Sequence, residues 1–181
     1  MNYIASILFI FLMILVIVFL LLLIAFLIFN YIPPLLLRGI AYVPTEKERI
    51  KKMIKFAAVK KGDKAVDLGS GDGCLILALA RAGAEAHGYE INYILVLWSK
   101  LRIKKAGLSG KAYVHWNNLW KADLKDFNIV FIYGFDYMMK KLEEKLAREL
   151  KPGARIVSNS FPLPTWPLSK KENGVYLYEK V

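Results

Sequence analysis

The stretch AVDLGSGDG, residues 65–73, is a short apolar run that meets an acid and then turns through three glycines. A buried strand followed by such a turn is typical of alternating α/β sheets, in which the first strand ends beside a ligand. Glycines there let the backbone approach the ligand closely at the head of the next helix. The stretch therefore predicts a strand, a turn formed by Gly69, Gly71 and Gly73, and a helix that begins near Cys74.

Apolar runs and helical stretches alternate from this point to the end of the chain. The expected strands cover residues 64–69, 86–91, 111–116, 128–135 and 154–161, and the expected helices cover 74–83, 92–107 and 137–153. Repeated strand and helix units of this length indicate a parallel sheet covered on both faces. Residues 165–181 hold Asn173-Gly174 between two extended runs and predict a final hairpin. We therefore expect a doubly wound α/β fold with seven strands.

The amino-terminal segment has the length and composition of a membrane span. Residues 3–29 contain no charged side chain. As a helix this segment is about 40 Å long, more than the ~30 Å hydrocarbon core of a bilayer. A cleaved signal peptide would need a shorter apolar core, a basic start and a small-residue cleavage site, and the segment has none of these. We therefore predict a retained transmembrane anchor over residues 1–31, which Pro33 and Pro34 end because proline lacks the helical N–H.

The rest of the chain divides into a short connector and one domain. Residues 32–44 are apolar but too short for a second span, so we expect them to connect the anchor to the domain at the bilayer interface. Residues 45–181 form the expected domain. Thr45 and Glu48 have the spacing of a capping box, which predicts that a helix begins at Thr45. Its apolar positions fall on one face, namely Ile50, Met53, Ile54, Ala57 and Ala58.

The charge balance is strongly basic, with 26 Lys and Arg against 15 Asp and Glu and a net charge of +11. Such a charge would suit nucleic acid, an anionic membrane surface or an acidic substrate. Basic side chains follow the span, and only the amino terminus is charged before it. The domain is therefore expected on the cytoplasmic side, or on the matrix side of the mitochondrial inner membrane in a eukaryote. The single cysteine, Cys74, excludes an internal disulfide and a zinc site built from cysteines.

The residues around the glycine turn favour a cation over a phosphate. A dinucleotide site would prefer glycine at the sixth position of the turn, where this chain has Cys74. Asp67 and Asp72 would also place negative charge beside a phosphate, and no Gly-Lys-Ser/Thr closes the turn as a P-loop requires. S-Adenosylmethionine (SAM) fits better, because it carries a protonated amino group and a sulfonium but no phosphate. Glu90, about twenty residues after the turn, is placed to accept hydrogen bonds from ribose hydroxyls.

The run VDLGSGDG, together with Glu90, resembles the cofactor site of the class I SAM-dependent methyltransferases, whose fold is Rossmann-like. A longer set of motifs covers nearly the whole chain: the anchor, then AYVPT, DLGSGDG, GYEIN, NLWKADL and FPLPTW. In this order they resemble the membrane-anchored protein-lysine methyltransferases of the FAM173 group. That group modifies mitochondrial inner-membrane proteins such as the ADP/ATP carrier and the ATP synthase c-subunit. The resemblance implies a protein-lysine N-methyltransferase with SAM as cofactor and an integral membrane protein as substrate.

The same resemblance implies roles for individual positions. The methionine side of SAM would be held by Asp67, Gly69, Gly71 and Gly73. Glu90 would contact the ribose, and Asn118 would border the adenine at a position where family members generally have Asp. The substrate entrance would be shaped by Tyr42, Pro44, Pro162, Pro164 and Trp166.

Methyl transfer requires an aligned and uncharged acceptor more than it requires a catalytic triad. A lysine acceptor must first lose its proton, and a desolvated pocket lowers the pKa of its ammonium group. Tyr133 and Asp136, in IYGFD after the expected fourth strand, are the candidate catalytic residues for steering or accepting that proton. We expect no metal site, because His87 and His115 lack the spacing of metal ligands.

Three other functions are weighed against lysine methylation. Enzymes that methylate nucleic-acid bases commonly carry an Asn-Pro-Pro-aromatic loop after the fourth strand, and this chain has YGFD there, so nucleic acid is disfavoured as a substrate. A lipid or quinone acceptor stays open, because the anchor would present the pocket to the bilayer. A non-catalytic SAM-binding or scaffold protein also stays open, because the sequence shows no obvious base.

Overall fold

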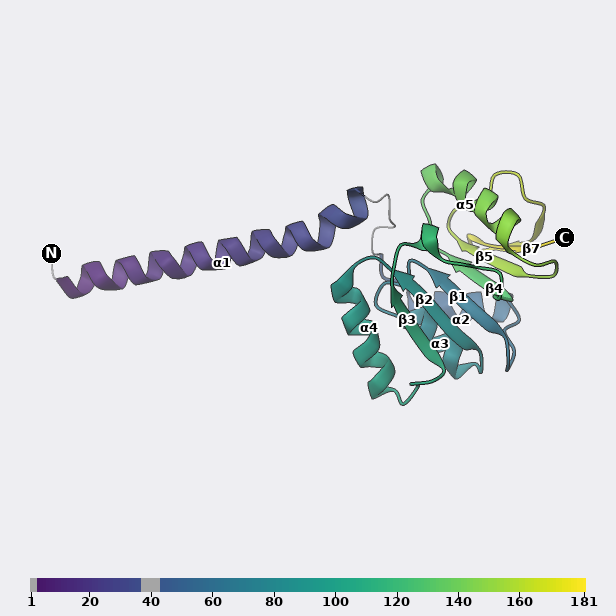
Figure 1. Ribbon diagram of the computed structural model, residues 1–181, viewed down its shortest axis with the longest axis horizontal. Coiled ribbons are helices and arrows are strands. Elements are labelled where there is room, and N and C mark those ends of the chain that lie inside the picture. The colour runs from purple at the N-terminus through teal and green to yellow at the C-terminus, as the bar shows by residue number, and fades with distance from the viewer. Residues whose placement is uncertain (1–2, 37–42) are drawn as a thin grey trace.

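The computed structural model describes residues 3–36 and 43–181, with side chains for 3–28 and 43–181. Figure 1 shows one long helix, α1 (Tyr3–Leu36), which projects from an α/β domain that contains the rest of the described chain. Within the described residues, α1 is the one helix whose length and composition would allow it to cross a membrane, over Tyr3–Ile28. None of that segment is buried against the domain.

The carboxyl end of α1 differs from the sequence prediction. The helix does not end at Pro33 and Pro34 but continues to Leu36. Proline has a fixed φ close to the helical value, so a helical backbone remains possible at both positions. The missing N–H groups weaken the last turn without ending it at the first proline.

The domain is built on one seven-stranded sheet with the strand order β3-β2-β1-β4-β5-β7-β6. The strands are β1 (Lys64–Leu68), β2 (Glu85–Glu90), β3 (Ala112–Trp116), β4 (Ile129–Ile132), β5 (Arg155–Asn159), β6 (Leu168–Glu172) and β7 (Val175–Glu179). The first five strands are parallel to one another, and β7 is antiparallel to both β5 and β6. This arrangement confirms the predicted doubly wound sheet with a closing hairpin.

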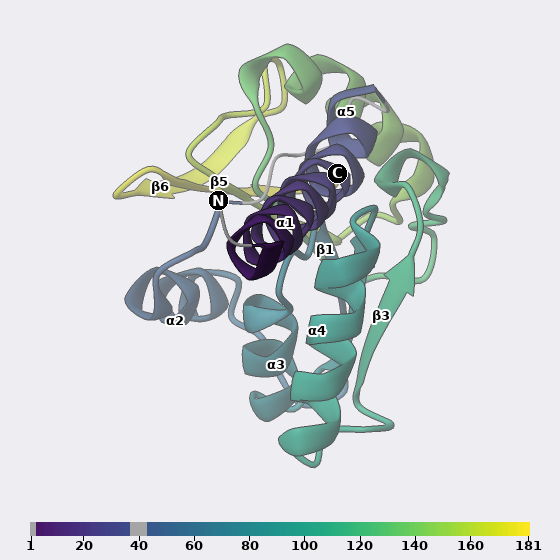
Figure 2. The same cartoon turned by 90° about the vertical axis from the view of Figure 1, so that its left-hand side faces the viewer.

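Helices cover both faces of this sheet (Figures 1 and 2). They are α2 (Lys47–Phe56), α3 (Cys74–Arg81), α4 (Tyr93–Lys105) and α5 (Asp136–Glu149), with a short 3-10 turn η1 (Leu119–Lys121) after β3. Ala65 of β1 packs in one core with α2, α3 and α4, whereas Val66 and Leu68 pack in a second core with α5. Successive residues of a strand point to opposite faces, so two covered faces explain why the apolar run before the glycine turn is continuous.

The start of α2 also differs from the sequence prediction. The helix begins at Lys47 with Glu46 at its N-cap, and no side chain caps it, so the predicted capping box of Thr45 and Glu48 is wrong. Glu48 instead bonds Lys51, with 2.8 Å between Oε1 and Nζ. Ile50 and Met53 are buried as expected, but Ala58 lies beyond the helix and is exposed.

The hairpin of β6 and β7 closes one edge of the sheet. Asn173 and Gly174 both have positive φ, +48° and +73°, as a two-residue hairpin turn of the primed type requires. All five residues of the edge strand β6 are exposed. The ammonium groups of Lys170 and Lys171 lie 4.8 Å from the ring centre of Phe56 and 5.1 Å from that of Tyr176.

Candidate functional site

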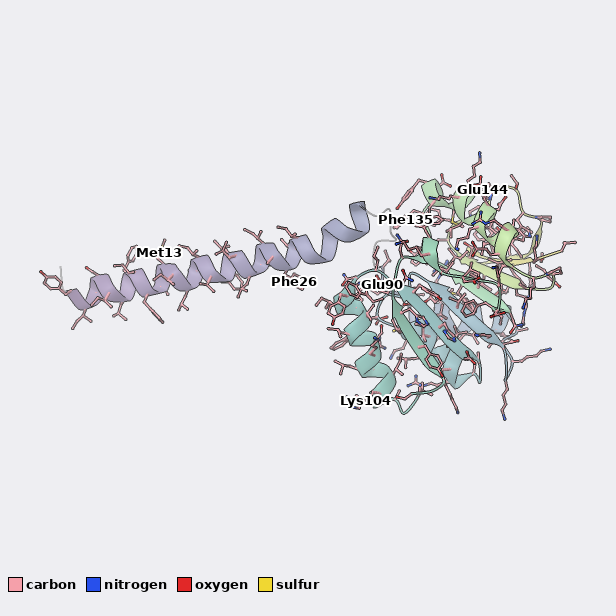
Figure 3. All side chains as sticks on the ribbon, viewed as in Figure 1. Met13, Phe26, Glu90, Lys104, Phe135 and Glu144 are labelled. Atoms are coloured by element: carbon pink, nitrogen blue, oxygen red, sulfur yellow. The ribbon has the colours of Figure 1, made fainter. Side chains whose placement is uncertain are left out.

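An open cleft lies where β1, β2 and β4 end. The strand order reverses between β1 and β4, and ligands of open α/β sheets bind at this point, outside the carboxyl ends of the strands. Figure 3 shows Glu90 at the end of the sheet nearest to α1. The cleft is lined by the glycine turn, by the carboxyl ends of β1, β2 and β4, by the start of α3, by α2 and by the segment that leads into α2. The lining residues are Val43, Thr45, Ile50, Met53, Asp67, Gly69, Ser70, Gly71, Asp72, Cys74, Leu75, Glu90, Ile132 and Tyr133.

The glycine turn has the backbone conformation that its sequence predicts. Gly69, Gly71 and Gly73 all have positive φ, at +96°, +53° and +76°. Gly73 is the N-cap of α3, and a Cβ atom added to it would lie 2.9 Å from the hydroxyl of Ser99. That hydroxyl donates a hydrogen bond of 3.0 Å to the carbonyl of Gly71. The turn is therefore shaped by glycine conformations on one side and by α4 on the other.

Glu90 joins the end of β2 to the glycine turn. Its side chain is buried, and its two oxygens accept hydrogen bonds from the backbone N–H of Gly71 at 2.8 Å and of Asn92 at 2.7 Å. Burial raises the pKa of the Glu90 carboxyl, and the hydrogen bonds from Asn92 and Gly71 partly oppose this rise. Both oxygens are thus fixed in direction and keep lone pairs for a ligand.

Asp67 lies on the floor of the cleft without a cation of its own. It is 7% exposed, and burial, followed by the charges of Glu90 and Asp72, raises its pKa to about 7. Among the described residues no side chain forms a salt bridge with it, whereas Asp72 is paired with Arg102 at 2.5 Å. A cation placed in the cleft would relieve the repulsion among these acids.

The site contains residues that the sequence analysis missed. Ser99 and Arg102 face the turn from α4, and Arg102 donates to both the side chain and the carbonyl of Asp72. Their spacing of three positions puts them on the same side of the helix, but Lys100, Lys104 and Lys105 in the same helix obscure this signal in the sequence. Ser70 also lines the cleft, and its buried hydroxyl has no hydrogen-bond partner in the described part of the chain.

The structure brings only some of the predicted residues to the cleft. Tyr133, predicted as catalytic, lines it, whereas Asp136 is exposed at the first position of α5 and is not part of the lining. Asn118 follows β3 and caps η1, where its side-chain oxygen accepts from the N–H of Trp120 at 3.0 Å. It too lies outside the lining residues, so a contact with adenine stays a prediction.

The predicted substrate entrance is divided. Pro44 is exposed between the lining residues Val43 and Thr45, and Tyr42 lies outside the described residues. Trp166 lies farther away, because its indole N–H donates to the carbonyl of Glu179 at 3.2 Å. Glu179 pairs with Arg155, the first residue of β5, so it lies at the end of the strands opposite the glycine turn.

Pro162 and Pro164 are exposed on either side of the buried Leu163. The N–H of Leu163 donates to the Tyr178 hydroxyl at 2.9 Å, which fixes this loop on the second core. Neither proline is part of the cleft lining, so their role at the substrate entrance remains a prediction.

Comparison with protein families shows that residues 67–170 match the ANTKMT methyltransferase domain. The chain is 38% identical over 125 residues to a lysine N-methyltransferase of Homo sapiens that is named for the c-subunit of ATP synthase, covering 69% of this chain and 53% of that protein. It is 40% identical over 134 residues to adenine nucleotide translocase lysine N-methyltransferase of Mus musculus, covering 74% and 58%. The chain thus spans little more than half the length of these two relatives.

Two further similarities cover nearly the whole of the compared protein. A protein-lysine N-methyltransferase of Saccharolobus islandicus is 33% identical over 159 residues, with 82% of this chain and 96% of that protein covered. A solved structure of an RNA methyltransferase from Salinibacter ruber, in complex with S-adenosyl-L-homocysteine, is 31% identical with a TM-score of 0.72. That match covers 76% of this chain and 92% of the other.

Proposed function

The chain belongs to the ANTKMT methyltransferase family, and from this membership we propose that it is a SAM-dependent protein-lysine N-methyltransferase. We further propose that α1 holds it in a membrane and that its acceptor is a lysine of an integral membrane protein. The named activities of the relatives from Homo sapiens, Mus musculus and Saccharolobus islandicus support the lysine acceptor. The apolar helix α1 supports the membrane setting.

The observation that carries the proposal is the buried acid pair beside the glycine turn. Asp67 and Glu90 both line the cleft, at the point of the sheet where ligands of open α/β folds bind. The acids suit the cationic amino group and ribose hydroxyls of SAM, and the unpaired Ser70 hydroxyl offers one more polar contact. The residues present therefore fit this cofactor.

When bound, SAM supplies a methyl group on a positively charged sulfur, which a nucleophilic nitrogen can accept. Glu90 holds the glycine turn in place through Gly71, so the ligand meets a preorganised backbone. Asp67 supplies negative charge to the floor of the cleft. These two residues bind and orient rather than react.

The acceptor lysine must react as a neutral amine. Its ammonium group gives up one proton before the methyl group is transferred, and the nitrogen carries the positive charge afterwards. The cleft wall formed by Ile50, Met53 and Ile132 excludes water from this side and lowers the pKa of an entering ammonium group. We assign Tyr133 to orienting the acceptor nitrogen and the exposed Asp136 to receiving the proton on its way to solvent.

The membrane setting limits which lysines the cleft can reach. Eleven steps of the chain separate Leu36 at the end of α1 from Lys47 at the start of α2, at most about 40 Å if fully extended. The acceptor should therefore lie close to the bilayer surface. The basic residues after the span favour the cytoplasmic side, or the matrix side in mitochondria.

Incubation of native membranes with labelled SAM and the full-length chain tests the proposal, with Glu90→Gln as the matched control. We expect methyl additions on lysines of integral membrane proteins and release of S-adenosylhomocysteine, both of which the control reduces. Label confined to lipid, quinone or RNA would contradict the lysine assignment. Binding of SAM without any S-adenosylhomocysteine would instead identify a non-catalytic binding protein.

A further inference from the structure

The outer side of α4 is apolar although it faces solvent. Tyr93, Ile94, Leu97, Trp98 and Leu101 are exposed there, and Trp116 at the end of β3 extends the same surface. We call these six residues the α4 patch. Their exposed fractions run from 38% for Tyr93 to 63% for Leu101.

This surface is unusual within the domain. Outside α1, the described residues include eleven exposed large hydrophobic side chains, and six of them belong to the α4 patch. The inner side of α4 is already packed, with Val96, Ser99 and Ile103 buried. A helix that is apolar on both sides requires a second cover in addition to its own core.

The α4 patch is contiguous and adjoins the cleft. The rings of Tyr93 and Trp116 are 4.8 Å apart, and the indole N–H of Trp116 donates to the carbonyl of Ile91 at 3.0 Å. A shallow hollow over Ile94, Leu97, Trp98 and Leu101 has Asp72 of the glycine turn on its rim. Whatever covers the patch therefore lies beside the mouth of the cofactor cleft.

The chemistry of the α4 patch suits the headgroup region of a bilayer. Trp and Tyr combine an apolar ring with a polar edge and are enriched at membrane interfaces. Lys100, Lys104 and Lys105 of the same helix are exposed, and their ammonium groups can reach anionic headgroups while their stems follow the apolar surface. Apolar residues flanked by lysines are typical of helices that lie in the plane of the interface.

The position of α4 in the molecule also favours the bilayer as the cover of the α4 patch. Figure 1 shows α4 on the side of the domain toward α1, running across the direction of α1, and Figure 2 shows it on the near face when the molecule is viewed from that side. A bilayer crossed by α1 would therefore extend along α4. The eleven steps between Leu36 and Lys47 keep the domain within reach of that surface.

We propose that the α4 patch is a second membrane contact, which inserts into the headgroup layer of the bilayer that α1 spans. The inference rests on the membrane anchoring proposed above, but not on the methyltransferase activity. It gives the domain a fixed orientation, in which the glycine turn and the cleft mouth face the bilayer surface. The contact thus selects acceptor groups by their depth in the membrane.

Tryptophan fluorescence of the full-length chain in lipid nanodiscs tests the contact. The chain has four tryptophans: Trp98 and Trp116 in the patch, Trp120 and Trp166 outside it, and none in α1. Discs of phosphatidylglycerol and phosphatidylcholine, brominated near the headgroup end of the acyl chains, should quench the emission. In the double variant Trp98→Phe/Trp116→Phe, we expect the fraction of tryptophan emission that the brominated lipid quenches to fall roughly threefold or more. The reason is that the two tryptophans at the interface are removed.

The matched control is Trp120→Phe/Trp166→Phe, which should retain the quenched part of the emission. SAM binding by each variant, measured in the same discs, verifies that the domain is folded and reports on the proposed function separately from the membrane contact. Equal quenching in both double variants, or none in the wild-type chain, would overturn the proposal. Quenching that appears only when a membrane protein is added would assign the patch to a protein partner instead. Failure of the chain to enter the discs would overturn the proposal as well, since α1 would then not span the bilayer.

Discussion

Glu90 connects the sheet to the ligand cleft at the scale of a single residue. Its carboxylate holds the N–H groups of Gly71 and Asn92 while facing the cleft that we assign to SAM. Replacement by Ala removes both a ligand contact and the support of the turn. We expect Glu90→Ala to weaken SAM binding by about 1.5–3 kcal/mol, the range for hydrogen bonds to a charged group. Isothermal titration calorimetry measures the change.

Glu85 provides the control on the same strand, because it is exposed at the start of β2. Glu85→Ala should leave SAM affinity within about twofold of the wild-type value, as expected for a surface substitution. An equal loss in both variants would show that Glu90 affects the strand and not the cofactor. Preferential binding of NAD, with no heat from SAM, would reject the cofactor itself.

Asp67 gives cofactor binding a pH dependence. Burial raises its pKa from 3.8 to about 7, so below pH 7 the free protein holds a proton at this carboxyl. A bound cation favours the carboxylate and displaces that proton. SAM affinity should therefore rise with pH up to about 7, by at most about tenfold per unit, and level off above it. Asp67→Asn should flatten the profile between about pH 5.5 and 7.

The same proton affects the stability of the free domain. The unfolded chain releases it near pH 4, whereas the folded protein keeps it to about pH 7, so the contribution of Asp67 to the unfolding free energy falls as pH rises through this window. Urea unfolding at several pH values measures the slope in the wild type and in Asp67→Asn. A slope that is unchanged in the variant would assign the titration to another group, such as Glu90.

At the scale of an element, the connection from β1 to α3 allows a test of whether α4 crowds the glycine turn. Gly73 and Gly107 both have positive φ, but a Cβ atom would meet Ser99 at Gly73 and open space at Gly107. Gly107→Ala should therefore cost only the backbone strain, about 1–2 kcal/mol of unfolding free energy. Gly73→Ala should cost more and also weaken SAM binding, because α4 must move away from the turn. Urea unfolding and calorimetry on both variants separate strain from crowding, and equal effects would contradict this account.

Hydrophobic patterning predicted most elements of the fold. All seven strands and the helices α3, α4 and α5 occur where their periodicity indicates, with ends shifted by a few residues. The patterning works because each strand of the parallel sheet is buried on both faces and each helix covers one of them. In the site, the turn of Gly69, Gly71 and Gly73 was predictable, because glycine alone adopts these backbone conformations without strain.

The remaining features depend on contacts that one sequence does not display. Thr45 has the residue type of a helix cap, yet it lines the cleft, so tertiary packing overrides the local signal. Trp166 follows a proline-rich loop, but its partner is the carbonyl of Glu179, thirteen residues later and at the far end of the strands. Ser99 and Arg102 reach the turn only because α4 packs beside it. Contacts between residues this far apart in the sequence become visible only in the folded structure.

At the scale of the whole molecule, the anchor can be deleted without touching the described lining of the cleft, provided that the deletion ends before Val43. Deletion of residues 1–31 removes most of α1 but no described residue of the cleft, so SAM affinity should stay within about twofold of the wild-type value. Methylation of membrane-embedded acceptors should fall by at least about tenfold, because the anchor raises their effective concentration. Calorimetry and methylation of native membranes measure the two effects.

Deletion of residues 1–46 provides the contrast, since it also removes Val43 and Thr45 from the cleft wall. This longer deletion should weaken SAM binding by roughly 1 kcal/mol, in proportion to the apolar surface lost. Equal affinity for both truncated chains would show that the segment before α2 takes no part in the site. A loss of affinity already in the shorter deletion would make α1 part of the domain.

The lysines of β6 affect how copies of a membrane-bound protein can pair with one another. An outermost strand leaves backbone donors and acceptors free to recruit the same strand of a neighbouring copy, and confinement to a membrane raises the frequency of such encounters. Lys170 and Lys171 place like charges along both of the edges that would meet, and their ammonium groups lie over the rings of Phe56 and Tyr176. Repulsion between these rims should keep copies apart during lateral diffusion and so prevent the growth of intermolecular β-ribbons.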